Sequence, residues 1–71
     1  MSPIPKILRE IRIEKALTQA QLAVVVGTGT TIISEWENYR ADPLLTSLER
    51  WADALGYELD VMLIQEKESV K

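Results

Sequence analysis

Apolar residues recur at helical spacing through residues 4–55 and predict four short helices. These helices are expected over residues 5–15, 19–26, 30–38 and 44–55. The apolar positions that would face a common core are Ile4, Ile7, Leu8, Ile11, Leu22, Ala23, Val26, Ile33, Trp36, Leu45, Leu48, Trp51, Ala52 and Leu55. The spacing leaves open whether Ile32 also faces inward.

A glycine joins the second and third expected helices. Thr18 is a good N-cap for the second helix, and Gln21 follows three residues later to complete a capping box. Gly27 can adopt the left-handed conformation that ends a helix. The candidate N-caps for the third helix are Thr28, Thr30 and Thr31. Two short helices joined by such a turn predict a helix-turn-helix over residues 18–39, whose second helix would enter the major groove of DNA.

After Gly56 the pattern changes from helical spacing to alternation. One face would carry Tyr57, Leu59, Val61 and Leu63, and the other Glu58, Asp60, Met62 and Ile64. The high β-propensity of these residues predicts one strand over residues 57–64, with a short fifth helix over residues 60–64 as the alternative. The expected fold is therefore one mainly α-helical domain, residues 1–71, of four helices followed by a short C-terminal β-strand.

The composition excludes several kinds of chemistry. The 71 residues include no cysteine and no histidine, so disulfides and thiolate metal sites are excluded and the commonest general base is missing. Glu35 and Glu37 are two residues apart on an expected helix and point in different directions. We therefore expect no enzymatic activity, no metal and no cofactor. No apolar run is long enough to cross a membrane, and a cytoplasmic protein is expected.

The net charge of −3 is unusual for a DNA-binding protein, because such proteins usually carry a basic surface. The charge is unevenly spread, however. Residues 1–15 have a balance of +2, residues 16–43 of −2 and residues 44–71 of −3. The acidic residues are therefore densest in the last segment, away from the expected reading helix.

From about Ile7 to about Val61 the sequence resembles the Cro/cI-type (XRE) helix-turn-helix proteins. The residues that carry the resemblance are Thr18-Gln19, Gln21-Leu22-Ala23, Gly27, Ile33-Ser34, Trp36-Glu37-Asn38 and Pro43. The resemblance implies a lambda-repressor-like fold and sequence-specific binding of double-stranded DNA by a transcription regulator, with repression as the expected role. Small members that end in a strand resemble the antitoxins of toxin–antitoxin pairs, which adds a toxin or another protein as a possible partner.

The third helix would present its base-reading side chains from its N-terminal half. The expected base contacts are Thr30, Thr31, Ser34 and Glu35. Threonine can donate or accept a hydrogen bond and touch a thymine methyl, and glutamate can accept from a cytosine amino group. The expected phosphate contacts, from the start of the second helix, the turn and the far end of the third helix, are Gln19, Thr28, Asn38 and Arg40.

The resemblance also implies a structural ion pair between Arg12 and Glu37, which would join the first helix to the third. At Tyr39 this chain departs from the family, which often has glycine in a left-handed turn. We expect Asn38 to take that turn or the third helix to run one residue longer. Asp42 is expected to cap the fourth helix.

A lone C-terminal strand needs a partner for its backbone, which predicts a homodimer through the dimer-strand residues Tyr57, Leu59, Val61 and Leu63. The alternative function is a protein-interaction module with weak or no DNA binding. The acidic balance favours it, as do Val24 and Val25, which stand where the family usually has polar residues. Val24 and Val25 are expected to have partial cover from neighbours, or else to form a contact surface for another protein.

Overall fold

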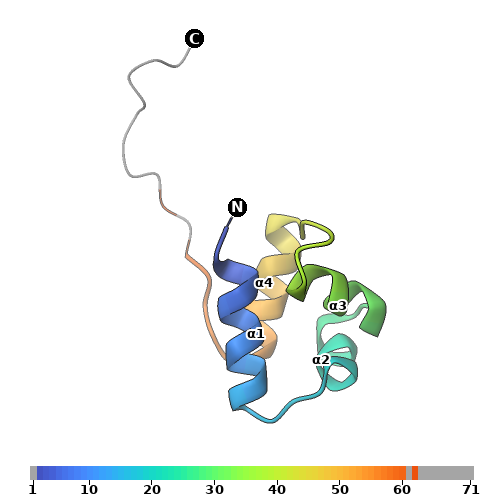
Figure 1. Ribbon diagram of the computed structural model, residues 1–71. Coiled ribbons are helices and arrows are strands. Elements are labelled where there is room, and N and C mark those ends of the chain that lie inside the picture. The colour runs from blue at the N-terminus through green and yellow to red at the C-terminus, as the bar shows by residue number, and fades with distance from the viewer. Residues whose placement is uncertain (1, 61, 63–71) are drawn as a thin grey trace.

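The computed structural model of the protein describes residues 2–60 and 62, and it contains four helices within them (Figure 1). The helices are α1 (Ile4–Glu14), α2 (Gln19–Val26), α3 (Thr30–Glu37) and α4 (Leu45–Ala54). α1 lies beside α4, and α2 packs against both α3 and α4. The prediction of a mainly α-helical helix-turn-helix domain is confirmed. No helix within the described ranges is long and apolar enough to cross a membrane.

The core is built around two stacked tryptophans. The ring centroids of Trp36 on α3 and Trp51 on α4 are 5.8 Å apart, with an angle of 28° between the ring planes. Such aromatic pairs contribute about 0.5–1.5 kcal/mol beyond the burial of their area. The residues buried around and including this stack are Leu8, Leu22, Ala23, Val26, Ile33, Trp36, Trp51, Ala52 and Leu55. All nine were predicted as core positions.

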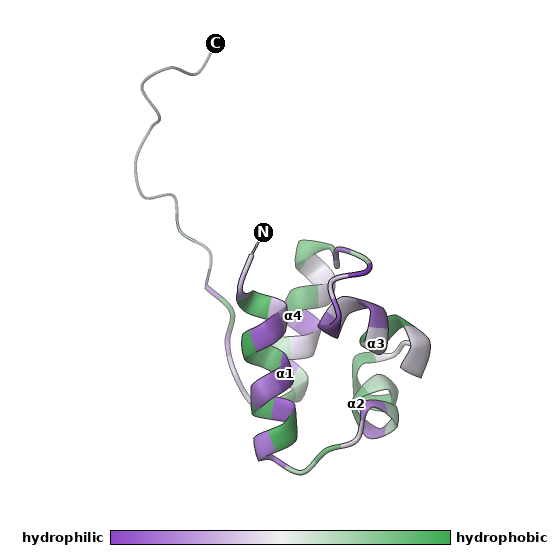
Figure 2. Ribbon diagram, in the orientation of Figure 1, coloured by the Kyte–Doolittle hydropathy of each residue, from purple (hydrophilic) through white to green (hydrophobic). Residues whose placement is uncertain are grey.

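Several apolar residues remain on the surface. Ile7 and Leu45 were predicted to face the core but are about half exposed. Val24 and Val25 are 80% and 67% exposed, so the expected partial cover by neighbours is small. Figure 2 shows α2 as mostly apolar, in keeping with this exposed pair.

The predictions for both ends of α2 are confirmed, whereas the one for the start of α3 is not. The Gln21 N–H donates to Thr18 Oγ1 at 3.0 Å and the Thr18 N–H donates to Gln21 Oε1 at 2.9 Å, which completes the capping box. Gly27 is left-handed, with φ of 87°. The predicted threonine cap for α3 is wrong. Gly29 occupies the N-cap position, and its carbonyl accepts the N–H groups of the first turn without any side chain.

The segment between α3 and α4 differs from both expectations. Tyr39 itself takes the left-handed turn, with φ of 58°, while Asn38 has φ of −100° and α3 ends at Glu37. The tyrosine hydroxyl makes two hydrogen bonds in this conformation, which offset its strain. Asp42 does not cap α4, because the helix begins later and its first turn closes on the carbonyl of Leu44.

The residues after α4 include the first half of the predicted strand. Residues 57–60 form no strand, because a strand needs a partner and the described residues offer none. Leu59 packs partly against the core, and the Lys15 ammonium lies 5.9 Å from the centre of the Tyr57 ring. Val61 and Leu63 lie outside the described residues, as does most of the alternative helix over residues 60–64. The strand therefore stays a prediction that concerns a second chain.

Candidate nucleic-acid interface

The outer face of α3 carries the predicted base-reading residues. Ile33, Trp36 and Glu37 are buried against the rest of the domain. Helical periodicity then directs Thr31 and Glu35, one turn apart, away from that buried side. Thr30 and Thr31 are exposed, and Ser34 and Glu35 are partly exposed. The four predicted residues thus lie together on the first turns of the helix.

Ile32 was missed as a functional candidate. Its side chain is 38% exposed and follows Thr31 on the same helix. An apolar side chain at such a position can touch the methyl group of thymine. The spacing gave no decisive signal, because successive helix residues such as Trp51 and Ala52 can both be buried in one core.

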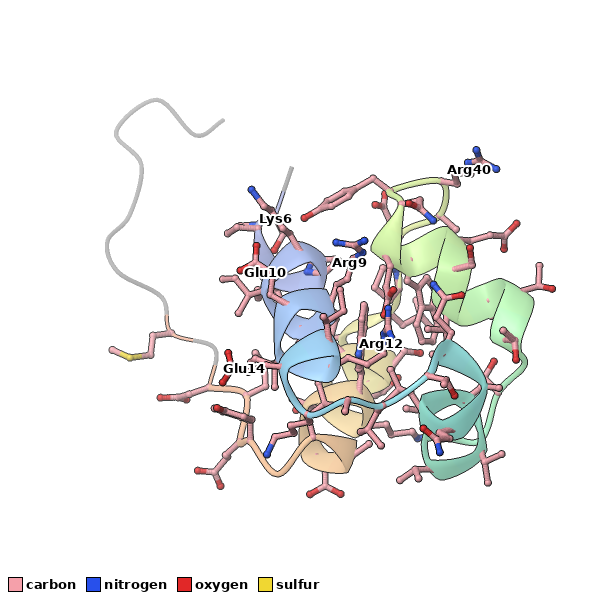
Figure 3. The ribbon with its side chains drawn as sticks, turned by 60° about the horizontal axis from the view of Figure 1, so that its bottom comes forward. Lys6, Arg9, Glu10, Arg12, Glu14 and Arg40 are labelled. Atoms are coloured by element: carbon pink, nitrogen blue, oxygen red, sulfur yellow. The ribbon has the colours of Figure 1, made fainter. Side chains whose placement is uncertain are left out.

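The four predicted phosphate ligands differ in their exposure and in their hydrogen bonds within the domain. The Gln19 side chain turns inward, where its Nε2 donates to Glu37 Oε1 at 3.0 Å, so α2 presents backbone N–H groups of its first turn instead. Thr28 lies partly buried in the turn. The Asn38 Nδ2 donates back to the carbonyl of Ser34 at 2.8 Å. Arg40 is exposed in the loop after α3 and projects from the domain (Figure 3).

A buried network fixes the orientation of α3. Arg12 binds Glu37 through two hydrogen bonds, Nε to Oε2 at 2.7 Å and Nη2 to Oε1 at 3.0 Å. The Glu37 side chain is fully buried, and that of Arg12 is 10% exposed. A third Arg12 hydrogen bond, Nη1 to the carbonyl of Leu17 at 2.7 Å, reaches the connection between α1 and α2. Together with Gln19, the network joins α1, α2 and α3 at one carboxylate.

Charges of both signs lie along α1. Figure 3 shows Arg9 on the side of α1 that faces α3 and Arg40 on the loop after α3, whereas Lys6 projects beside Glu10 on the other side of α1 and Glu14 lies further along that side. Four further acidic residues line one shallow hollow at the end of α4, and they are Glu49, Asp53, Glu58 and Asp60. Figure 1 places the end of α4 away from α3. The negative net charge therefore belongs largely to a part of the surface that does not include the outer face of α3.

The residues that the structure describes contain no group of three acidic, histidine or cysteine side chains that could hold a metal ion.

Comparison with known proteins identifies the family. A family model described as Helix-turn-helix, HTH_3, matches residues 8–62, which include most of α1 and all of α2, α3 and α4. A search of curated proteins found no match. The matched span contains the capping box, the left-handed Gly27 and the Arg12–Glu37 pair described above. This chain belongs to the Cro/cI-type (XRE) family of helix-turn-helix proteins, a family of DNA-binding regulators.

Proposed function

We propose that the protein binds a specific sequence of double-stranded DNA with α3 in the major groove and represses transcription from that site. The observation that carries the proposal is the division of α3 into two faces. Ile33, Trp36 and Glu37 anchor one face, while Thr30, Thr31 and Glu35 stand on the other. A rigidly anchored helix with short polar side chains outward is suited to reading base edges.

The outer residues favour particular bases. The Glu35 carboxylate can accept a hydrogen bond from the amino group of cytosine. It would repel base edges that offer only hydrogen-bond acceptors. The methyl groups of Thr31 and Ile32 can contact the thymine methyl. We therefore expect the preferred half-site to contain cytosine and thymine on the strand that α3 faces.

Phosphate contacts would set the register of α3 without reading sequence. Arg40 is exposed, and the N–H groups of Gln19 and Ala20 at the start of α2 have no partner within that helix. The Asn38 amide donates to Ser34 and would exchange this contact for a phosphate. So few cations release few counterions, and the affinity of one domain should be modest.

We also propose that two copies act together. An antiparallel pairing of residues 57–64 from two chains would satisfy the backbone of the predicted strand. It would also bring together the apolar side chains on the dimer face of the strand, which include Tyr57, half exposed in the single chain. Two α3 helices about 34 Å apart would then reach successive major grooves of a near-palindromic site.

The second candidate is an antitoxin-like interaction module that binds a toxin or another protein. The exposed Val24 and Val25 on α2 favour it, because they offer apolar surface on a helix other than the one that carries the predicted base-reading residues. The two functions are compatible if α2 binds protein while α3 binds DNA.

Selection of bound sequences from random duplex DNA at 0.15 M salt tests the proposal. We expect enrichment of one near-palindromic site whose half-sites are centred about one helical turn apart. Recovery of no preferred sequence, together with equal binding to every duplex, would contradict sequence-specific recognition and leave the interaction module as the better account.

Arg40→Ala is expected to weaken binding to the selected site and to unrelated DNA by a similar factor, because phosphate contacts carry no base information. The slope of log K against log salt should become shallower by about 0.9. Arg50→Ala on α4 is the matched control, since it removes the same charge from an exposed position on a different helix. A change in sequence preference on loss of Arg40 would instead make this arginine a base-reading residue.

A further inference from the structure

A mainly apolar groove, here called the α1 groove, lies between α1 and the chain that follows α4. Ile4, Ile7 and Ile11 on one face of α1 form one wall, and residues 57–59 form the other. Figure 1 shows the segment after α4 running alongside α1. Glu58 is the one charged residue among the described residues that line the groove. Its volume is about 200 Å³, and since an apolar cavity of about 150 Å³ can hold benzene, there is room for one aliphatic side chain.

The α1 groove leaves apolar side chains uncovered at its rim. Ile7 belongs to the apolar face of α1 that was predicted to face the core, yet it is 49% exposed, and Tyr57 in the other wall is 50% exposed. Leu59, in the same wall as Tyr57, packs partly against the core. An apolar side chain placed in the groove beside Leu59 would remove this surface from water, which is favourable.

The C-terminal part of the chain can supply such a side chain. The sequence continues from the groove with Val61, Leu63 and Ile64, all aliphatic. In an extended strand Leu63 would lie about 13 Å beyond Leu59 of its own chain, so it could return to its own groove only through a turn. The β-branched Val61 would stand in that turn and disfavours it. A second copy of the chain is therefore the better source.

The pairing of two copies determines which side chain reaches Leu59. Residues directly opposite each other in an antiparallel ribbon point to the same face, so the dimer face requires odd positions opposite odd positions. Of the two such registers nearest the middle of residues 57–64, a centre at Asp60 would place two carboxylates opposite each other, which is unfavourable. A centre at Val61 avoids this repulsion and sets Leu59 of one chain opposite Leu63 of the second copy.

We propose that the α1 groove binds Leu63 of a second copy of this chain, so that each domain of the dimer receives one side chain from its partner. The inference rests on the proposed pairing of residues 57–64. It deepens that proposal because it makes the dimer depend on α1 as well as on the strand. Leu63 would lie between Ile7 and Leu59 and complete the cover of this face of α1.

A substitution at the rim of the groove tests the inference in the full chain. Ile7→Gln should raise the dimer dissociation constant at least about tenfold in sedimentation equilibrium, because it places a polar side chain against Leu63 in both halves of the dimer. Ile13→Gln is the matched control and should change the constant less than about twofold. Ile13 lies on the same helix, is 51% exposed and is not among the described residues that line the groove. Equal effects of the two substitutions, with unchanged helical circular dichroism, would overturn the inference.

Cross-linking between different chains identifies the occupant of the groove. Chains with Ile7→Cys and chains with Leu63→Cys are mixed, left to exchange partners and oxidised. Peptide mapping should then find a disulfide between position 7 of one chain and position 63 of the other, and Ile13→Cys in place of Ile7→Cys should give little of the corresponding product. A chain with both Ile7→Cys and Leu63→Cys that closes the disulfide within itself, while the mixture forms none, would assign the groove to its own C-terminal segment and refute the inference.

The outcomes separate this inference from the proposed function. A dimer that shows neither the cross-link nor the effect of Ile7→Gln would refute binding of Leu63 in the α1 groove and leave the strand pairing intact. A full-length chain that stays a monomer at every concentration would refute both the inference and the proposed dimer. Reading of DNA by α3 is tested separately, by selection from random duplexes.

Discussion

Glu37→Ala is expected to lower the free energy of unfolding by about 3–5 kcal/mol, because it leaves the buried Arg12 guanidinium without its counter-charge. It also removes the acceptor of Gln19 on α2. A domain of this size has a small core and a stability near the low end of the usual range of about 5–15 kcal/mol. Most of its stability would be lost. Urea denaturation followed by circular dichroism measures the change.

A double-mutant cycle separates the ion pair from its surroundings. Replacing Arg12 and Glu37 together with methionine should cost less than Glu37→Met alone, because no buried charge is then left unpaired. The coupling should exceed the value of roughly 0–1 kcal/mol that is typical of surface pairs. Arg9→Met is the control, since that side chain is half exposed and stands 3.9 Å from the same carboxylate. Coupling near zero would contradict the structural role, as would a fully folded Arg12→Ala protein that had lost only DNA binding.

Removal of residues 61–71 is expected to convert the protein to a monomer and to weaken binding to a near-palindromic site by about 10²–10⁴-fold, because the second α3 would no longer be tethered. Ending the chain after Asp60 retains Leu59, which packs against the core, and unchanged helical circular dichroism would show that the domain still folds. Sedimentation velocity and DNA titration measure the two effects.

Cysteine cross-linking locates the dimer contact. The natural sequence has no cysteine, so single cysteines introduced one at a time over residues 57–64 report only on contact between chains. In an antiparallel ribbon, the residue nearest the two-fold axis faces its own copy and should form a disulfide most readily. A full-length chain that sediments as a monomer at micromolar concentration, while binding its site tightly, would contradict the dimer.

Local features of the fold could be predicted from the sequence. The capping box of Thr18 and Gln21 and the left-handed Gly27 depend on residues within one or two turns of each other, and all are confirmed. Apolar periodicity likewise identified the buried residues around Trp36 and Trp51. The conformation of Tyr39 could not be predicted, because its side chain is held by hydrogen bonds to Ser2 and Lys6, more than 30 residues earlier in the chain.

Part of the candidate site could likewise be predicted from the sequence, and part could not. Periodicity alone places Thr31 and Glu35 opposite Ile33 and Trp36. It does not show that the Gln19 side chain turns inward to Glu37, since that contact joins different helices. The exposure of Ile32 depends on how closely the neighbouring helices cover the side of α3, which follows from packing rather than from spacing.

The most direct test of DNA reading by α3 is the ratio of dissociation constants for unrelated and selected DNA, measured for the unmodified chain and for Thr31→Ala with Glu35→Ala. We expect a ratio of about 10³ or more for the unmodified protein. Each lost base contact should lower the free-energy difference between selected and unrelated DNA by about 1–3 kcal/mol, so the double variant should lose at least about 30-fold in specificity. Its binding to unrelated DNA should stay the same or tighten, because a negative charge is removed. An unchanged ratio, with the same site recovered by selection, would contradict the proposal that α3 reads the sequence.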